Sequence, residues 1–183
     1  MGNKISCQRN LFNIPDEIVY LNTAYISPLS LKVEKAINKG CKLETEPWKI
    51  DPEFHFFYQI KETKIIFSNL FNISYKNVSL IPSASYGIST AANNIKLTKT
   101  KNKILILKDQ FPSNVYPWME LSKKQEGVLE IIDELNETTL TEEIINKISE
   151  EVAVVAIPNI RWTDGYIIDL KKVSNTCKKF DVN

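Results

Sequence analysis

The second half of the chain alternates short apolar runs with longer segments in which apolar residues recur at helical spacing. Short apolar runs are typical of buried strands, and the periodic segments are typical of amphipathic helices. The predicted strands are residues 78–81, 103–107, 128–132 and 152–157. The predicted helices are residues 85–95, 113–124, 140–150 and 170–180. This alternation predicts a three-layer α/β/α domain with a mostly parallel central sheet.

The first half shows helical periodicity with only one short extended segment, predicted at residues 18–21. Ser27-Pro28 predicts the start of a first helix, because Ser is a good N-cap and Pro fits the first helical position. The apolar stripe of this helix comprises Val33, Ala36, Ile37, Gly40 and Cys41. Asp51-Pro52-Glu53 repeats the start signal for a second helix. The predicted buried face of that helix comprises Phe56, Ile60, Phe67, Leu70 and Phe71.

Composition indicates an ordinary globular protein. The chain has 183 residues, of which 43% are hydrophobic and 25% charged, with a net charge of +1. Positive and negative residues are interleaved and form no basic face, which argues against a nucleic-acid partner. No apolar run approaches the length of a membrane span, so we expect no membrane partner.

Cysteine and histidine usage argues against a disulfide-stabilised protein and against a metal site built on histidines. The three cysteines, Cys7, Cys41 and Cys177, form no C-x-x-C pair, which favours a reduced, cytoplasmic compartment over a disulfide framework. The single histidine, His55, has no second histidine with which to share a metal site, so we expect a packed or surface side chain. Residues 1–6 match a short N-myristoylation pattern, which stays as an alternative without other support.

Two stretches carry candidate chemistry. Pro82-Ser83-Ala84-Ser85 lies between a predicted strand and a predicted helix. Free N–H groups at such a helix start form an anion site, so this turn predicts either a phosphate cradle or an ordinary serine N-cap. Asp109, Gln110 and Phe111 follow the strand at 103–107, where parallel sheets bind ligands. Phe111 is predicted either to stack on a flat ring or to pack as a hydrophobic staple on the next helix.

Taken together, these stretches resemble the class V aminotransferase family of pyridoxal-phosphate enzymes, relatives of cysteine desulfurases and kynureninases. Four blocks carry the resemblance, in family order and spacing: YLNTAYISPLS (20–30), IPSASYGIST (81–90), DQFPSNVYPWMEL (109–121) and AVVAIPNIRWTDGYIIDL (153–170). EPWKIDPEFHFF (46–57) resembles the region that links the first two blocks. The resemblance therefore covers essentially the whole chain.

The resemblance implies the fold and the division of the chain. It implies the large domain of the fold type I pyridoxal-phosphate-dependent transferases, truncated here. Residues 1–75 would be an N-terminal helical segment that lines the active site. Residues 76–183 would be part of the cofactor-binding large domain, without its C-terminal part and without the small domain.

The resemblance also implies roles for single residues. Ser83, Ala84 and Ser85 match the turn that binds the phosphate of pyridoxal 5'-phosphate, and Phe111 matches the residue that stacks on the pyridine ring. Three residues match the segment on the substrate side of the pocket: Asn22, Thr23 and Ala24. Trp162 stands where many relatives have an Asn near the ring hydroxyl of the cofactor. This departure puts a polar contact in doubt and favours Trp162 as a wall of the pocket.

Two residues of the family pattern, an Asp and a Lys, have no match in this chain. The Asp that pairs with the pyridine nitrogen and the Lys that binds the cofactor covalently would both lie beyond Asn183. We therefore expect the N-terminal portion of an enzyme that acts on an amino acid by transamination, desulfuration, racemisation or elimination, with this chain alone inactive. The alternative is a non-catalytic remnant, or an interaction subunit that complements a separate C-terminal half. A homodimer is expected from the family alone.

Overall fold

The computed structural model describes residues 5–133 and 138–183, and the chain forms two compact units, Met1–Leu80 and Ile81–Asn183. Each unit is described by itself below. The assignment of residues 1–75 and 76–183 to separate functional parts stays a prediction. The myristoylation pattern depends on residues 1–4, which lie outside the described residues.

The second unit is built on a parallel sheet. Its strands are β1 (Lys103–Leu107), β2 (Val128–Ile132) and β3 (Val152–Ala156), in the order β2-β1-β3. Both neighbours of β1 run parallel to it, with Lys103 opposite Val128 on one side and Val152 on the other. The three strands therefore form where the apolar runs predicted them, and the parallel sheet is confirmed.

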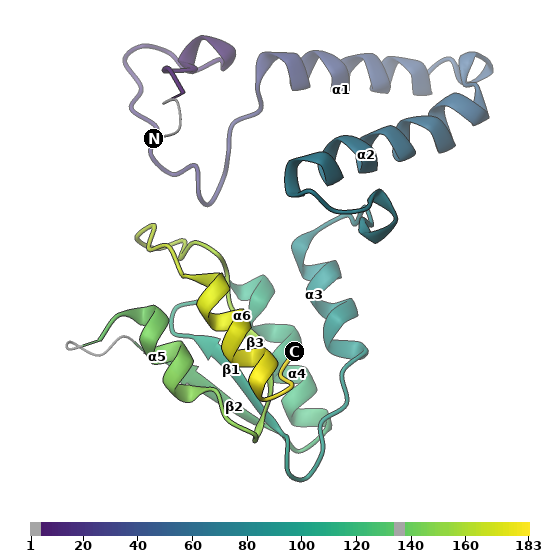
Figure 1. Ribbon diagram of the computed structural model, residues 1–183. Helices are drawn as coiled ribbons and strands as arrows, with labels where there is room; N and C mark the ends of the chain where they lie inside the picture. Colours follow the sequence, from purple (N-terminus) through teal and green to yellow (C-terminus); the bar gives the residue numbers. More distant parts are fainter. Residues whose placement is uncertain (1–4, 134–137) are drawn as a thin grey trace. The chain divides into compact units, whose positions relative to one another are not determined.

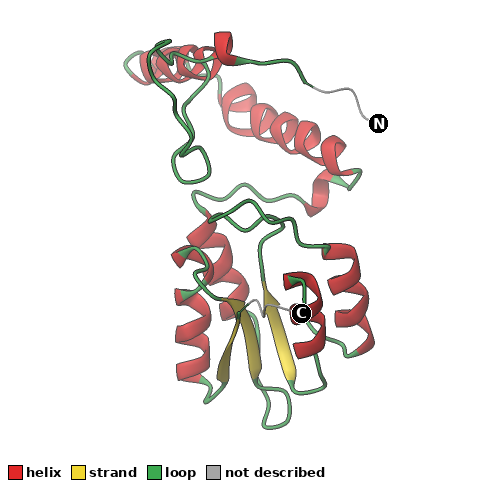
Figure 2. Cartoon of the chain, turned by 90° about the vertical axis from the view of Figure 1, so that its left-hand side faces the viewer, coloured by secondary structure: helices red, strands yellow, loops and turns green. Residues whose placement is uncertain are grey.

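Helices cover both faces of this sheet (Figure 1), and Figure 2 shows them on either side of the strands. The helices are α3 (Ala84–Asn93), α4 (Tyr116–Lys124), α5 (Leu140–Lys147) and α6 (Leu170–Lys179). One core cluster joins the sheet to α5 and α6 through Leu140, Ile144 and Val173. The other joins it to α3 and α4 through Ala92, Trp118 and Leu121. The predicted α/β/α layering is therefore confirmed.

A β-bulge in β3 decides which side chains face which layer. Lys103 of β1 lies opposite Val152, but Ile104 lies opposite Val154, so Ala153 is an extra residue in β3. Ala153 and Val154 consequently pack into the same core cluster, although they are neighbours in sequence. Val155 then returns to the opposite cluster.

Short polar residues cap α3, α5 and α6, whereas Val115 at the start of α4 provides no side-chain cap. Thr139 and Glu142 form a reciprocal capping box at the start of α5, and Asp169 accepts a hydrogen bond from Lys172 N–H (3.0 Å) at the start of α6. Ser83 caps α3 in the same way. Because these side chains satisfy N–H groups that have no partner within the helix, the loop residues fix where these three helices start.

The strand predicted at residues 78–81 is wrong. In the structure this segment forms no strand, although Val78 is buried. A strand needs a neighbouring strand for its backbone hydrogen bonds, and among the described residues no strand pairs with this segment. Leu80 and Ile81 remain about half exposed. Val78 has an extended backbone, but an apolar run does not specify the strand with which it would pair.

The first unit consists of two helices and short turns. Helix α1 spans Leu31–Glu44 and helix α2 spans Gln59–Phe71, preceded by a π-helical turn at Glu53–Tyr58. Single 3-10 turns lie at Arg9–Leu11, Pro47–Lys49 and Tyr75–Asn77. No helix in residues 5–133 or 138–183 has both the length and the apolar composition needed to cross a bilayer.

Two predictions for this unit need correction. The first helix is capped by Ser30, whose Oγ accepts from Val33 N–H, and not by Ser27. The start signal at Asp51 is confirmed, since its Oδ1 accepts from Glu53 N–H (3.0 Å). The predicted buried face of the second helix is wrong, and the apolar stripe of the first helix is also largely exposed. The exposed apolar residues include Val33, Ile37, Phe56, Ile60, Phe67, Leu70 and Phe71.

The reason for this exposure is the lack of a second layer. Of the described residues in the first unit, only Ser68 and Val78 are buried. An apolar stripe becomes a core only where another element covers it, and neither α1 nor α2 is covered within this unit.

Candidate functional site

The first turn of α3 is the predicted phosphate-binding turn. Ser83 Oγ accepts a hydrogen bond from Tyr86 N–H (3.2 Å), and the Ser83 carbonyl accepts one from Gly87 N–H (3.2 Å). Among the described residues, the N–H groups of Ala84 and Ser85 have no acceptor. Such N–H groups, together with the positive end of the helix dipole, favour an anion at this position.

A hydrogen bond ties this turn to the segment after β1. Ser85 Oγ donates to Ser113 Oγ at 3.0 Å, across 28 positions of sequence. Ser113 lies in a 3-10 turn, Pro112–Asn114, directly after Phe111. Asn114 continues the connection, because its Nδ2 donates to the carbonyl of Ala156 at the end of β3 (3.3 Å). The starts of α3 and α4 are therefore held at the carboxyl edge of the sheet.

Phe111 and Trp162 form an aromatic corner at this edge. Their ring centroids lie 5.4 Å apart with an interplanar angle of 87°, an edge-to-face arrangement. Trp162 Nε1 donates to the carbonyl of Asp109 at 2.8 Å. Asp109 has a left-handed backbone, with φ of 53°, so the chain turns sharply just before Phe111. Gln110 Oε1 accepts from Phe111 N–H at 2.8 Å.

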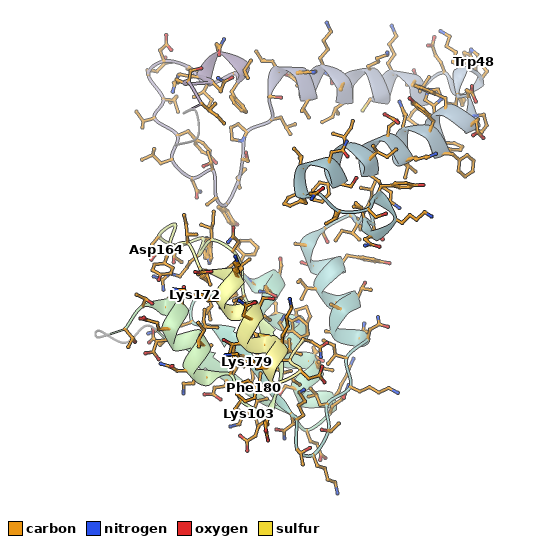
Figure 3. The ribbon with its side chains drawn as sticks, viewed as in Figure 1. Trp48, Lys103, Asp164, Lys172, Lys179 and Phe180 are labelled. Atoms are coloured by element: carbon orange, nitrogen blue, oxygen red, sulfur yellow. The ribbon has the colours of Figure 1, made fainter. Side chains whose placement is uncertain are left out.

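Trp162 sits on a compact turn. Arg161 N–H donates to the carbonyl of Tyr166, and Gly165 N–H donates to the carbonyl of Arg161, both at 2.9 Å. Gly165 adopts φ of 78°, which only glycine reaches without strain, and Asp164 appears in the loop before α6 in Figure 3. Hydrogen bonds from the Arg161 guanidinium and the Tyr166 N–H lower the pKa of Asp164 to about 2.

A groove lies along α3 and α4, with a cavity volume of about 600 Å³. It includes Ser85 and Ser113 at one end and Glu120 and Lys124 of α4 farther along. Neither Phe111 nor Trp162 lines it. Of the predicted site residues only Ser85 borders this groove, so the groove and the aromatic corner are distinct features.

Asn22, Thr23 and Ala24 belong to the first unit. The carbonyl of Asn22 accepts hydrogen bonds from Tyr25 N–H (3.2 Å) and Ile26 N–H (3.0 Å), which close a turn. Thr23 and Ala24 are exposed in this turn. Their assignment to the substrate side stays a prediction.

Lys108 follows β1 at the same edge of the sheet. Its Nζ lies 2.6 Å from Asp133 Oδ2, and the hydrogen bond and charge of that carboxylate raise the pKa of Lys108. A raised pKa keeps an amine protonated and makes it a poor nucleophile near neutral pH. Lys108 therefore has a structural ion pair, not the environment of a reactive lysine.

Two expectations from the sequence concern metals and thiols. No group of three or more metal-binding side chains occurs in the part of the chain that the structure describes. His55 Nδ1 is hydrogen-bonded to the backbone of Asp51 at the start of its helix. Burial raises the pKa of the Cys177 thiol, which packs against the core under α6. Cys177 is thus an inert packing residue.

Sequence comparison identifies relatives of one family. The aminotransferase class-V family model matches residues 50–183. A probable cysteine desulfurase of Borreliella burgdorferi is 25% identical over 174 residues, which cover 92% of this chain and 38% of that protein. A probable cysteine desulfurase of Mycoplasma genitalium is 25% identical over 125 residues, covering 68% and 31% respectively. The chain thus spans about a third of the length of these relatives.

Solved structures share the fold. A C-DES variant with glycine covalently linked to its PLP cofactor matches with a TM-score of 0.80 and 15% identity, over 97% of this chain and 47% of that chain. The apo cysteine desulfurase of Thermococcus onnurineus NA1 matches with a TM-score of 0.76 and 16% identity, over 95% and 44%. The fold is therefore that of the fold type I pyridoxal-phosphate enzymes. With the family model covering most of its length, this chain belongs to the aminotransferase class-V family.

Proposed function

We propose that this chain supplies the phosphate-binding and ring-stacking part of a pyridoxal-phosphate site in a cysteine desulfurase-like enzyme that acts on an amino acid. The observation that carries the proposal is the convergence of three separate segments at one edge of the sheet. The Ser85–Ser113 bond (3.0 Å) joins the first turn of α3 to the segment after β1. The Trp162–Asp109 bond (2.8 Å) joins that segment to the loop after β3.

The groups at this edge fit the two ends of the cofactor. The N–H groups of Ala84 and Ser85 would hold its phosphate, and the Ser83 hydroxyl can still donate its proton. The Phe111 ring would lie against the pyridine ring. When bound, the cofactor supplies an electron sink for chemistry at the α-carbon of an amino acid. Phosphate at a helix N-terminus and an aromatic face for the ring are the contributions of this chain's own residues.

We further propose that no described lysine binds the cofactor covalently. Lys108 is nearest to the site in sequence, but its ion pair with Asp133 holds it protonated. Lys172 and Lys179 lie on α6 (Figure 3), and Lys172 is 3.8 Å from Asp169. Lys178 and Lys179 occupy the last turn of α6, where cations complement the helix dipole. The position of each of these lysines is thus explained by an ion pair or by the end of a helix, without a role in binding the cofactor.

Binding is tested by titrating the purified chain with pyridoxal phosphate and following the absorbance of the cofactor. Removing one hydroxyl at the phosphate turn (Ser85→Ala) is expected to raise Kd about five- to tenfold, roughly 1–1.4 kcal/mol. The matched control is Ser174→Ala on α6, which should leave Kd unchanged. Inorganic phosphate should compete with the cofactor. Equal Kd values for wild type and Ser85→Ala would show that this turn does not bind the cofactor phosphate.

The lysine proposal has a separate test. After incubation with pyridoxal phosphate the chain is treated with borohydride, digested and analysed by mass spectrometry. We expect low, scattered modification of exposed lysines. Stoichiometric labelling of one lysine, abolished by its change to Arg, would contradict the proposal.

A second candidate function is an interaction subunit, and the outer edge of β3 favours it. Asn183 N–H donates to the Ala153 carbonyl (3.1 Å), and Val155 N–H donates to the Asn183 carbonyl (2.9 Å), so the backbone of Asn183 pairs with this edge in the pattern of a parallel ladder. An edge of this kind pairs with an added strand, from this chain or another. Co-expression with a polypeptide equivalent to the remainder of a full-length cysteine desulfurase tests the idea. Co-purification supports it, and independent elution contradicts it.

A further inference from the structure

Trp162 contacts both the ring of Phe111 and the backbone of Asp109 in the turn before it, and Gln110 contacts the Phe111 backbone. We propose that Trp162 is a positioning residue that fixes the ring of Phe111 and does not itself hydrogen-bond to the bound ligand. The ring held in this way is the one that the proposed function places against pyridoxal phosphate, so the ligand part of this inference rests on that proposal. The restraint itself is a property of the ligand-free chain.

The first step concerns the indole N–H. A tryptophan has a single hydrogen-bond donor, and that of Trp162 is directed at the Asp109 carbonyl at 2.8 Å. The bond joins residues 53 positions apart and fixes the peptide that enters the turn before Phe111. Asp109 is in the left-handed region, where a non-glycine residue needs support from its surroundings. The indole therefore holds the backbone that carries Phe111.

The second step concerns the rings. At 5.4 Å and 87°, the two rings meet edge to face, an arrangement that depends on the orientation of both planes. Rotation of Phe111 about its side-chain bonds would lose this geometry. Trp162 itself cannot easily follow such a rotation, because its indole N–H is already bonded to Asp109.

The third step is the backbone of Phe111 itself. Its N–H donates to Gln110 Oε1 at 2.8 Å. Because an N–H can only donate, this contact fixes which end of the Gln110 amide faces Phe111. The other end, Nε2, is buried and has no partner among the described residues. The Gln110 amide thus contacts the backbone of Phe111 through its oxygen alone.

The support under Trp162 is rigid enough for this task. Its turn is closed by the Arg161–Tyr166 and Gly165–Arg161 backbone bonds, and Ile160 and Ile167 on either side form an isolated antiparallel bridge. The Arg161 guanidinium also lies over the Tyr166 ring, 5.5 Å from its centroid. A positioning side chain needs such a base, because a mobile loop cannot orient its target.

The direct test measures Phe111 without any ligand. The ring-proton resonances of Phe111 are assigned by NMR in wild type, Trp162→Phe and Trp162→Ala. Trp162→Phe keeps a ring but loses the N–H, whereas Trp162→Ala loses both. We expect the Phe111 resonances to shift in both variants, more in Trp162→Ala. The control is Trp48→Phe, an exposed tryptophan in the first unit, which should shift nothing. Unchanged Phe111 resonances in a folded Trp162→Ala would overturn the proposal.

A double-mutant cycle with pyridoxal phosphate tests the second half of the inference. Trp162→Phe is expected to raise Kd about threefold and Trp162→Ala about tenfold. If Trp162 acts through Phe111, then Trp162→Ala should add little in a Phe111→Ala background. A further tenfold loss there would show direct contact with the ligand and overturn the inference. If wild type binds no pyridoxal phosphate, the proposed function fails, while the NMR result still decides the positioning role.

Discussion

Helix α2 in residues 1–80 and helix α5 in residues 81–183 both carry apolar residues at helical spacing, but only α5 buries them. In α5, Leu140 and Ile144 are 1% and 0% exposed, whereas in α2, Leu70 and Phe71 are 76% and 61% exposed. The difference lies outside the helices, because α5 packs on the sheet and α2 packs only against its flanking turns. Periodicity thus specifies a face, and the layer that covers it makes the core.

The largest expected effect comes from the core of the second unit. Ile144→Ala removes a fully buried side chain and leaves a cavity against the sheet, so the free energy of unfolding should fall by about 2–5 kcal/mol. Phe67→Ala in α2 is the matched change, and because Phe67 is already 46% exposed it should cost less than about 1 kcal/mol. Urea denaturation followed by circular dichroism measures both. Equal losses would show that α2 is covered in solution.

Amide hydrogen exchange provides a second test of the difference in stability between the two units. The amides of β1 and β3 are enclosed between two core clusters, so they should exchange only when the whole unit unfolds. The amides of α1 and α2 should exchange through local opening, at least about a hundredfold faster, equivalent to roughly 2.7 kcal/mol. Mass spectrometry of peptic peptides resolves the two groups. Similar protection in α2 and β1 would contradict the contrast.

Helix capping should have a smaller effect, again in one unit only. Thr139→Ala removes the capping box of α5 and should lower the free energy of unfolding of the second unit by about 1 kcal/mol. Ser30→Ala removes the corresponding cap of α1, whose bond to Val33 N–H is 3.4 Å long. We expect it to reduce helical content without moving the main transition. A matching shift of the denaturation midpoint would couple α1 to the core.

The smallest expected effect depends on pH. The pKa of Asp164, about 2, lies below its ordinary value of 3.8, so its ion pair with Arg161 stabilises the fold above pH 4 and is lost as the pH falls towards 2. Asp164→Asn should therefore flatten the decline of stability between pH 4 and pH 2. Asp16→Asn removes an exposed pair at 3.7 Å in the first unit and serves as the control. An NMR titration of the Asp164 carboxyl carbon with a midpoint near 4 would disprove the assignment.

The sequence was sufficient for the parts of the fold that depend on local pattern. The strands at 103–107 and 128–132 match β1 and β2 at both ends, because a short run of β-branched residues and leucines has few alternatives. The helix predicted from Ser85 begins one residue earlier, at Ala84, with Ser83 as its N-cap. The strand at 78–81 and the buried face of α2 were not predictable, since both depend on a distant partner.

The candidate site shows the same limit. The sequence identified Ser85, Phe111 and Trp162 separately, through the blocks in which they occur. It gave no sign that Ser113 would bond to Ser85 or that Trp162 would bond to Asp109, because these pairs are 28 and 53 positions apart. Gln110 was noted only for its place after a strand. Its contact with the Phe111 N–H follows from a left-handed turn at Asp109, which no composition signal predicts.

The extra residue Ala153 in β3 shifts by one position the pattern in which side chains alternate between the two faces of the sheet. Side chains alternate between the two faces of the sheet on both sides of Ala153, but the alternation shifts by one residue there. Val152 and Val155 therefore lie in one cluster, while Ala153 and Val154 share the other. Deleting this one small residue would regularise the pairing and leave Val154, Val155 and Ala156 in the layers that they face now, because their partners in β1 would stay the same. The segment that follows leads to Trp162. A single-residue deletion at Ala153, 9 positions upstream of Trp162, should therefore disturb the aromatic corner less than a deletion at Val155, which would reverse the alternation of the residues that follow.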